Sequence, residues 1–197
     1  MDFAGAAPNL RSKPGVIGPG DTVILWLGRS ELTYVVAKPG AKLDNRFGAF
    51  HHDDMLGKPW GARVQSRQGR GWVLALRPTP ELWTNALSLR TQIIHELDQA
   101  MIAAELHLRP GQVVVESGTG SGAMSMSILR CLGPTGHLYT YEYNKERADA
   151  ARGEFAQMRL GDRATVTHRD ACAAPFLDPA PEAGVDAVFL DLPQPPK

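Results

Sequence analysis

The stretch Val113–Gly122 constrains the fold more than any other part of the sequence. An apolar β-branched run ends in the carboxylate Glu116, the glycines Gly118, Gly120 and Gly122 alternate with small residues, and a helical pattern follows. Glycine lets ligand atoms approach the backbone, and the free N–H groups at a helix N-terminus bind polar ligand atoms. The stretch therefore predicts a strand, a tight turn and a helix that bind a nucleotide-like ligand.

The composition is that of a globular protein, with 43% hydrophobic and 21% charged residues among 197. Lys+Arg and Asp+Glu both number 21, so the net charge gives no sign of a polyanionic partner, although a local basic stripe would be enough for one. The two cysteines lie far apart, and neither a secretory signal nor a membrane-spanning run is found. These features predict a soluble intracellular protein that does not bind a membrane.

The chain divides by pattern into three parts. Residues 1–19 are rich in Gly, Pro, Ala and Ser and predict a flexible tail, and residues 20–77 predict a small β domain of short strands between glycine turns. Two prolines in Pro78–Pro80 mark the boundary. From there to residue 197, strands alternate with helices, which predicts a doubly wound, Rossmann-like α/β domain. Its parallel strands, about four in number, are expected at 113–116, 137–142, 164–168 and 185–191.

Two further helices are predicted, one before the glycine stretch and one after the strand at 137–142. The first is predicted from an apolar stripe at helical spacing, and Asn144 is expected to cap the second. The run 185–191 is apolar on both faces, as in a central strand of a parallel sheet. The apolar stripe of the first helix consists of Ile94, Leu97, Met101, Ala104 and Leu108.

Carboxylates at the strand ends indicate what the loop binds. Glu142 ends the second strand, where it can accept hydrogen bonds from both hydroxyls of a ribose, and Asp170 follows the third strand, where it could meet an adenine amino group. A dinucleotide such as NAD also fits this pattern. Glu116 suits a cationic amino-acid end better than a pyrophosphate, and Asp191 has no task in hydride transfer. Together they favour S-adenosylmethionine.

Asp191 is the candidate catalytic residue. It is the last residue of the strand at 185–191 and is followed by Pro193, so it faces the ligand crevice. When an adenine ring nitrogen accepts a methyl group, positive charge develops on the base. A carboxylate that hydrogen-bonds the exocyclic amine would stabilise that charge and could later take a proton.

A basic stretch without any acidic residue runs through the β domain and suggests contacts to phosphates and bases. A solvated β face with buried Trp side chains explains the same composition. The stretch holds Lys58, Arg63, Arg67, Arg70 and Arg77, with Trp60 and Trp72 between them. The four consecutive residues 51–54, two His and two Asp, predict a turn and no metal site.

Five separated motifs, taken together, resemble the eukaryotic catalytic subunit of the tRNA (adenine-58-N1)-methyltransferase, a class I S-adenosylmethionine-dependent methyltransferase. The resemblance covers the chain from about Gly20 to Pro193. In order, the motifs are Pro78–Trp83, Arg90–Ile94, Val115–Gly122, Gly133–Leu138 and Phe189–Pro193.

The resemblance implies methylation of N1 of adenosine 58 in the T-loop of tRNA, in a nuclear heterotetramer with a related non-catalytic subunit and without a metal. It implies a catalytic role for Asp191 and a position near the substrate for Gln92, Ile93, His95 and Glu96. The implied cofactor residues are Ile94, Gly120, Ser121, Gly122, Glu142, Arg147, Asp170 and Ala171. The glycine stretch itself adds Glu116 and Gly118 to the expected cofactor residues.

Two departures from the family pattern stand out. Residues 95–98 read His-Glu-Leu-Asp where the family has Tyr-Ser-Thr-Asp, and the family continues well past the Asp-Leu-Pro motif at 191–193. A class I methyltransferase sheet has seven strands, so we expect an incomplete domain in which the far edge of the strand at 185–191 has no partner. The alternatives are a truncated non-catalytic tRNA-binding subunit and a NAD-dependent oxidoreductase.

Overall fold

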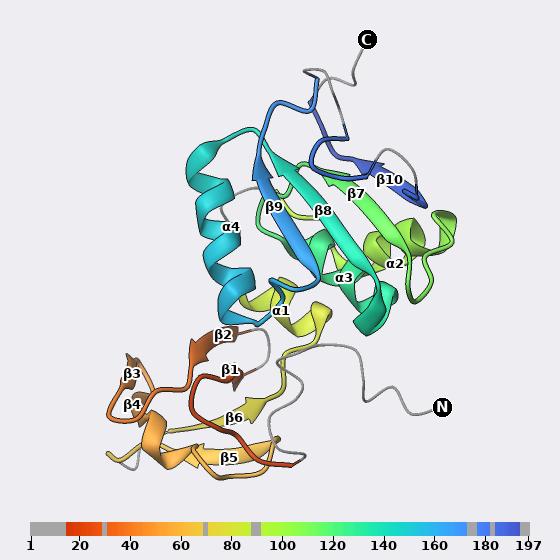
Figure 1. Ribbon diagram of the computed structural model, residues 1–197. Coiled ribbons are helices and arrows are strands. Elements are labelled where there is room, and N and C mark those ends of the chain that lie inside the picture. Colours follow the sequence, from red (N-terminus) through yellow and green to blue (C-terminus); the bar gives the residue numbers. More distant parts are fainter. Residues whose placement is uncertain are drawn as a thin grey trace. The chain divides into compact units, whose positions relative to one another are not determined.

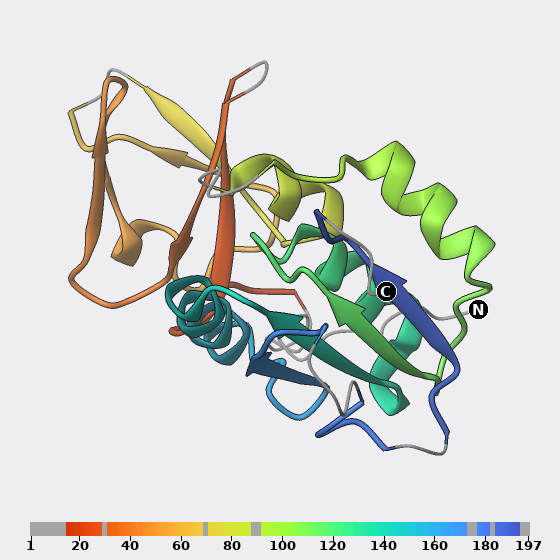
Figure 2. The same ribbon diagram turned by 90° about the horizontal axis from the view of Figure 1, so that it is seen from above.

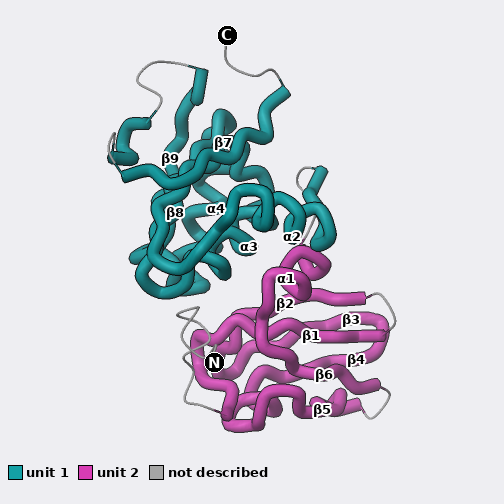
Figure 3. The backbone as a smooth tube through the Cα atoms, turned by 90° about the vertical axis from the view of Figure 1, so that its right-hand side faces the viewer, with its two compact units in different colours: residues 1–8, 89–197 teal, residues 9–88 magenta. Residues whose placement is uncertain are grey.

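The computed structural model describes residues 15–28, 31–68, 71–87, 92–172, 177–181 and 184–193. These residues form two compact units (Figure 3), unit 2 within residues 9–88 and unit 1 from residue 89 onward. Some sequence features lie outside the described residues: the predicted tail up to residue 14, the tip of the first hairpin at 29–30, and Arg70, Arg90 and Thr91.

Unit 2 is the small β domain that the sequence predicts. An antiparallel sheet has the strand order β2-β1-β6-β5, and β3 pairs with β4 in a separate hairpin. One face of the sheet packs on a core that includes Leu25, Phe50, Met55 and Val73. The elements are β1 (Thr22–Gly28), β2 (Glu31–Val36), β3 (Lys42–Asn45), β4 (Gly48–His51), η2 (His52–Asp54), β5 (Ala62–Gln65), β6 (Trp72–Leu76) and α1 (Pro80–Ala86).

Helix α1 begins in the proline-rich stretch that the sequence assigns to the domain boundary. The side chain of Thr79 caps the helix by accepting a hydrogen bond from the N–H of Leu82 at 3.3 Å, and Pro80 occupies the first turn. Trp83 is buried against Tyr34 of β2, with ring centroids 4.6 Å apart. Because α1 packs on β2 in this way, it belongs to unit 2, and the units divide later than Pro78–Pro80.

Unit 1 contains a parallel sheet of order β10-β7-β8-β9, which confirms the predicted α/β domain with four parallel strands. Figure 1 shows these strands side by side, with α3 packed on β7 and β8 and with α4 packed on β8 and β9. The elements are α2 (Glu96–Glu105), β7 (Val113–Ser117), α3 (Ala123–Leu132), η3 (Gly133–Thr135), β8 (His137–Glu142), α4 (Lys145–Gln157), β9 (Ala164–His168) and β10 (Ala187–Leu190).

Strand β10 lies at the margin of the parallel sheet, as Figures 1 and 2 both show. It pairs with β7, and no strand of the described residues pairs with its other edge. The outer side chains Val188 and Leu190 are exposed. The apolar run is therefore a strand, as predicted, and its far edge is unpaired among the described residues, as expected for an incomplete class I sheet.

Helix α2 is present, but the prediction of its buried face is wrong. Leu97 and Met101 of the apolar stripe are 79% and 66% exposed, whereas Gln99 is buried. The Gln99 side-chain amide donates to the carbonyl of Ile94 at 2.6 Å, on the side where α2 packs against α3. Periodicity finds an apolar stripe, but only neighbouring elements decide which side of a helix is covered.

Candidate functional site

The glycine loop joins β7 to α3 and supplies backbone N–H groups at the carboxyl ends of the parallel strands. The N–H groups of Gly118 and Thr119 donate to the carbonyl of Tyr141 at 2.9 and 3.2 Å, which ties the loop to β8. Gly118 has a φ of +101°, and a Cβ there would lie 2.3 Å from the carbonyl oxygen of Asp191. Only glycine fits this position, because the loop passes directly against the chain that follows β10.

Glu142, at the end of β8, is held as a buried carboxylate. It accepts hydrogen bonds from the N–H groups of Gly120 and Asn144, both at 2.9 Å, and from the guanidinium of Arg147 at 3.0 and 2.6 Å. Burial alone would raise the pKa of Glu142, but the bonds from Arg147, Asn144 and Gly120 outweigh burial and hold the pKa below its ordinary value. The site therefore contains a fixed negative charge beside the glycine loop.

The local sequence explains the position of Arg147. The predicted cap is confirmed, because the Asn144 side chain accepts a hydrogen bond from the N–H of Arg147 at 2.9 Å and starts helix α4. The first turn of α4 then directs the Arg147 side chain back to Glu142. The pair joins the end of β8 to the start of α4.

Glu116, predicted to lie at the cofactor, is fully buried beneath the loop. Its Oε2 atom accepts hydrogen bonds from Ser125 of α3 at 2.5 Å and from Thr140 of β8 at 2.7 Å. Burial is the main reason that the pKa of Glu116 is raised to about 7, and the negative charges of Asp191 and Glu142 raise it further. The two hydrogen bonds lower the pKa but do not offset burial. The carboxyl group joins β7, β8 and α3 under the loop.

Replacement of Glu116 by Gln should change how stability depends on pH. The folded-state pKa of about 7 lies above the ordinary value of 4.5, so the folded protein keeps a proton that the unfolded chain releases in this window. The wild type therefore loses stability as pH rises from 4.5 to 7, and Glu116→Gln removes this loss. Urea unfolding at both ends of the window should show that the stability of the variant relative to wild type improves at the higher pH.

Glu146→Gln, on an exposed turn of α4, controls for the loss of a carboxyl group. An equal difference between Glu116→Gln and wild type at both pH values would contradict the assignment of a raised pKa to Glu116.

Two adjoining cavities open at the glycine loop, with volumes of about 390 and 350 Å³. Both are lined by the loop, by the end of β8 and by the segment after β10. Residues common to both are Gly118, Glu142, Arg147, Asp191, Leu192 and Pro193. The cavities therefore form one site with two lobes that meet at Glu142 and Asp191.

The first lobe adds the segment before α2 and more of the loop, and the second adds the end of β9. Predicted site residues in the first lobe are Gln92, Ile93, Ile94, Gly118, Gly120, Ser121, Glu142, Arg147 and Asp191. The second lobe adds Asp170 and Ala171. The structure thus brings together eleven predicted residues that are spread over five segments of the chain.

Four predicted residues lie away from both lobes. Glu116 is under the loop, and Gly122 precedes α3, where its N–H donates to the carbonyl of Thr119 at 2.8 Å. His95 and Glu96 are exposed at the start of α2, with 3.8 Å between His95 Nδ1 and Glu96 Oε2. The sequence departs from the family pattern at the same two positions.

Sequence reasoning did not select several residues that line the site. Thr119, Tyr143, Leu192 and Pro193 directly follow or lie between selected residues, so their place in the motifs was a usable signal. Arg169 and Cys172 flank the selected Asp170 and Ala171 and carried the same signal. Met124 carried no comparable signal, and it lines the first lobe because the first turn of α3 lies there.

Asp191, like Glu142, lines both lobes. Its N–H donates to the carbonyl of Ser117 at 2.9 Å, which extends the pairing of β10 and β7 to the point where the glycine loop begins. Its side chain is exposed. A carboxylate in this position can accept a hydrogen bond from a ligand in either lobe.

Neither a metal cluster nor a membrane-spanning helix occurs in the described segments. Among those residues, no group of three His, Cys, Asp or Glu side chains is arranged to hold a metal ion. None of the helices there has the length and apolar character needed to span a bilayer.

At residues 51–54 a short 3₁₀ turn forms, as predicted, and the ring of His52 accepts a hydrogen bond from the N–H of Lys38.

Comparison with protein families matches residues 71–197 to the tRNA methyltransferase complex GCD14 subunit family. A similar curated protein is the tRNA (adenine(58)-N(1))-methyltransferase catalytic subunit of Schizosaccharomyces pombe, 42% identical over 89% of this chain and 49% of that protein. The corresponding Dictyostelium discoideum subunit is 40% identical over 91% of this chain and 58% of its own length. The chain spans about half the length of these relatives.

Solved structures agree with the fold class. A SAM-dependent O-methyltransferase from Thermotoga maritima has a TM-score of 0.74 and 28% identity, over 93% of this chain and 67% of its own. A tRNA (m1A58) methyltransferase from Aquifex aeolicus has a TM-score of 0.67 and 26% identity, over 90% and 66%. The predicted Rossmann-like class I methyltransferase domain is thereby confirmed.

Proposed function

The chain belongs to the tRNA methyltransferase complex GCD14 subunit family, and on this basis we propose that it carries the cofactor site and catalytic carboxylate of a tRNA (adenine-58-N1)-methyltransferase. The observation that carries the proposal is the position of Asp191 against Gly118, where both lobes meet. In the alternative function, that of a NAD-dependent oxidoreductase, a carboxylate at this position would have no role in hydride transfer.

The residues fit S-adenosylmethionine. Its adenine base and its amino-acid end extend from a central ribose, and the two lobes extend from Glu142 in the same way. We assign the adenine to the lobe with Asp170 and Ala171. The amino-acid end belongs to the lobe with Gly120, Ser121 and Ile94, where loop N–H groups and a helix N-terminus favour a carboxylate.

Glu142 would bind the ribose. A carboxylate offers about four acceptor positions, and the contacts with the loop, Asn144 and Arg147 use most of them. Oε2 accepts the Gly120 N–H and has capacity for a ribose hydroxyl. These contacts fix the carboxylate before the ligand arrives, which lowers the entropic cost of binding.

The chemistry divides between cofactor and protein. When bound, S-adenosylmethionine supplies an electrophilic methyl group. Asp191 would accept a hydrogen bond from the exocyclic amine of the target adenine and stabilise the positive charge that N1 alkylation places on the base. The exposed Asp191 carboxylate could then take the proton that the product loses. Gln92 and Ile93, at the mouth of the first lobe, are placed to touch the substrate.

The test is a titration with S-adenosylmethionine by isothermal calorimetry, with Glu142→Gln as the variant. The wild type should bind the cofactor, and the variant should bind roughly tenfold or more weakly, because a charge-assisted hydrogen bond to the ribose is lost. Glu146→Gln is the matched control, because Glu146 is exposed in the first turn of α4, four residues after Glu142. This variant should bind the cofactor as wild type does.

Other outcomes separate the alternatives. Thermal protection by NAD and none by S-adenosylmethionine would support the oxidoreductase. Cofactor binding without methyl transfer to tRNA, with and without a partner subunit, would support the non-catalytic tRNA-binding subunit.

The proposal extends to the assembly. Because the family is described as a subunit of a methyltransferase complex, a related non-catalytic subunit is the proposed partner. The heterotetramer and the nuclear location rest on the family resemblance alone and stay predictions.

A further inference from the structure

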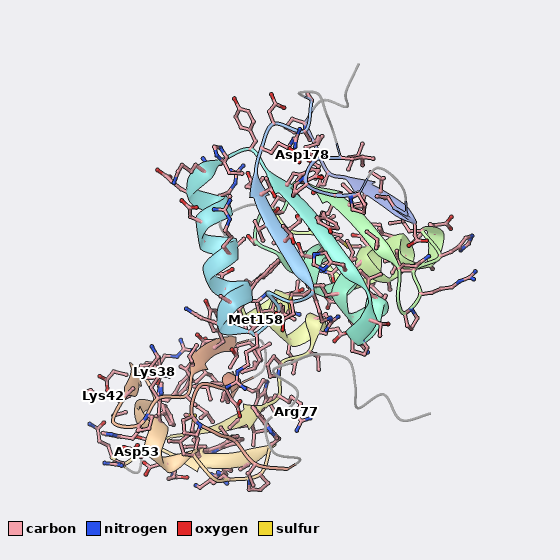
Figure 4. All side chains as sticks on the ribbon, in the orientation of Figure 1. Lys38, Lys42, Asp53, Arg77, Met158 and Asp178 are labelled. Atoms are coloured by element: carbon pink, nitrogen blue, oxygen red, sulfur yellow. The ribbon has the colours of Figure 1, made fainter. Side chains whose placement is uncertain are left out.

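The basic stretch of unit 2 is not used by the cofactor site, and the structure divides its cations into two kinds. Arg67 forms an ion pair with Asp54, at 2.9 and 3.2 Å. Arg63 instead lies over the ring of Trp72, with its guanidinium carbon 4.3 Å from the ring centroid. Arg77 lies over Trp60 in the same manner at 5.3 Å, just beyond the end of β6 (Figure 4). Stacking on indole rings therefore orients two of the guanidinium groups.

Arg63, Trp72 and Trp26 share one face of the antiparallel sheet. In the register, Arg63 of β5 lies opposite Leu74 of β6, and Leu74 lies opposite Trp26 of β1. Trp72 is two residues from Leu74 and so points to the same side. The Trp26 and Trp72 rings are 5.9 Å apart, so three planar groups stand in a row. We call this row the Trp-Arg surface.

The opposite face of the sheet explains why the Trp-Arg surface faces outward. Val23, Leu25, Val64, Val73 and Ala75 alternate with the residues of the surface and are fully buried in the core. Trp72 is 38% exposed, which is high for a side chain of its size. A large aromatic side chain that stays partly exposed is typical of a contact site.

The three strands that carry the Trp-Arg surface, β1, β5 and β6, present a positive charge and no acid on that face. In the part of the chain that the structure describes, Arg63 forms no ion pair, whereas Arg46, which lies over Phe47 at 4.8 Å, is paired with Glu31. Arg63 thus offers its charge and its N–H groups to a partner.

We propose that the Trp-Arg surface binds unpaired nucleotides of RNA, with bases stacked on Trp72 and Arg63 and a phosphate bonded to the Arg63 guanidinium. Aromatic rings and guanidinium planes stack on bases, and the guanidinium fork matches a phosphate. A purely apolar protein partner would bury the Arg63 charge without compensation, which is unfavourable. The choice of RNA over DNA rests on the proposed function.

The experiment measures the affinity of the full chain for a fluorescein-labelled tRNA transcript and for a short single-stranded RNA by fluorescence anisotropy. Trp72→Ala should weaken binding roughly tenfold, because a stacking partner is lost, and Trp72→Phe should restore most of it. Arg63→Ala should weaken binding and lower the slope of log Kd against log salt by about one. Arg46→Ala, a stacked arginine that is paired with an acid, is the matched control and should bind like wild type.

The proposal would be overturned if both Trp72→Ala and Arg63→Ala bound RNA as tightly as wild type. It would also be overturned if these variants lost binding to a protein partner while their RNA affinity stayed unchanged. Binding of S-adenosylmethionine and the melting temperature are measured on each variant, and both should match wild type. If the chain binds RNA through the Trp-Arg surface but does not bind the cofactor, the proposed function fails and the inference on the surface stands.

Discussion

Replacement of Asp191 by Ala is expected to reduce methyl transfer to tRNA by about 10²–10³-fold while cofactor affinity stays close to that of wild type. The side chain is exposed where the two lobes meet, and its backbone, not its carboxylate, joins β10 to β7. Removal of the carboxylate should therefore cost transition-state stabilisation and little structure. Single-turnover transfer and calorimetric titration with S-adenosylmethionine, both on the intact protein, measure the two quantities.

Asp191→Asn separates charge from shape, because it keeps a hydrogen-bond acceptor but not the negative charge. It should transfer faster than Asp191→Ala and slower than wild type. Asp162→Ala, an exposed carboxylate in the turn before β9, is the control for the loss of a surface charge. An equal loss of transfer and of cofactor affinity in Asp191→Ala would assign the residue to the cofactor and not to the reaction.

Gly118→Ala should abolish detectable cofactor binding and lower the free energy of unfolding by about 2–4 kcal/mol. The new Cβ would lie 2.3 Å from the Asp191 carbonyl oxygen, and the φ of +101° is one that alanine rarely adopts. The loop must therefore move, and with it the N–H groups that hold Tyr141 and Glu142. Urea unfolding and calorimetric titration report the two losses.

Gly153→Ala is the matched control. Gly153 lies in helix α4, and a Cβ there would meet nothing within 4 Å. Since alanine favours helix more than glycine does, this variant should be about 0.5–1 kcal/mol more stable than wild type and bind the cofactor normally. If Gly118→Ala matched Gly153→Ala in stability and in cofactor affinity, the close approach of the loop to Asp191 would not be needed for cofactor binding.

Local features were predictable because they depend on neighbours in sequence. The strand, loop and helix around Gly118, and the cap at Asn144, follow from turn chemistry and capping within a few residues. Strand β3 was not predicted. Its residues Lys42–Asn45 carry few apolar side chains, and it forms because β4 pairs with it.

Glu116 shows what a motif leaves open about the direction of a side chain. Its place just before the loop suggested contact with a ligand, but strand alternation directs it, like Val114, to the side that α3 covers. The fixed period of a strand was a usable signal in the sequence. That Ser125 and Thr140 would meet the carboxylate was not, because they come from α3 and β8.

The class of the fold, the glycine loop with its helix, and the carboxylates at the strand ends can all be predicted from the amino-acid sequence. These follow from the backbone preferences of individual residues and from apolar periodicity, which act over short stretches of chain. The packing of the elements decides that helix α2 buries Gln99 and leaves Leu97 and Met101 exposed, and that Asp191 contacts Gly118. Such contacts join residues far apart in the chain, and their free energy depends on which surfaces meet when the elements pack.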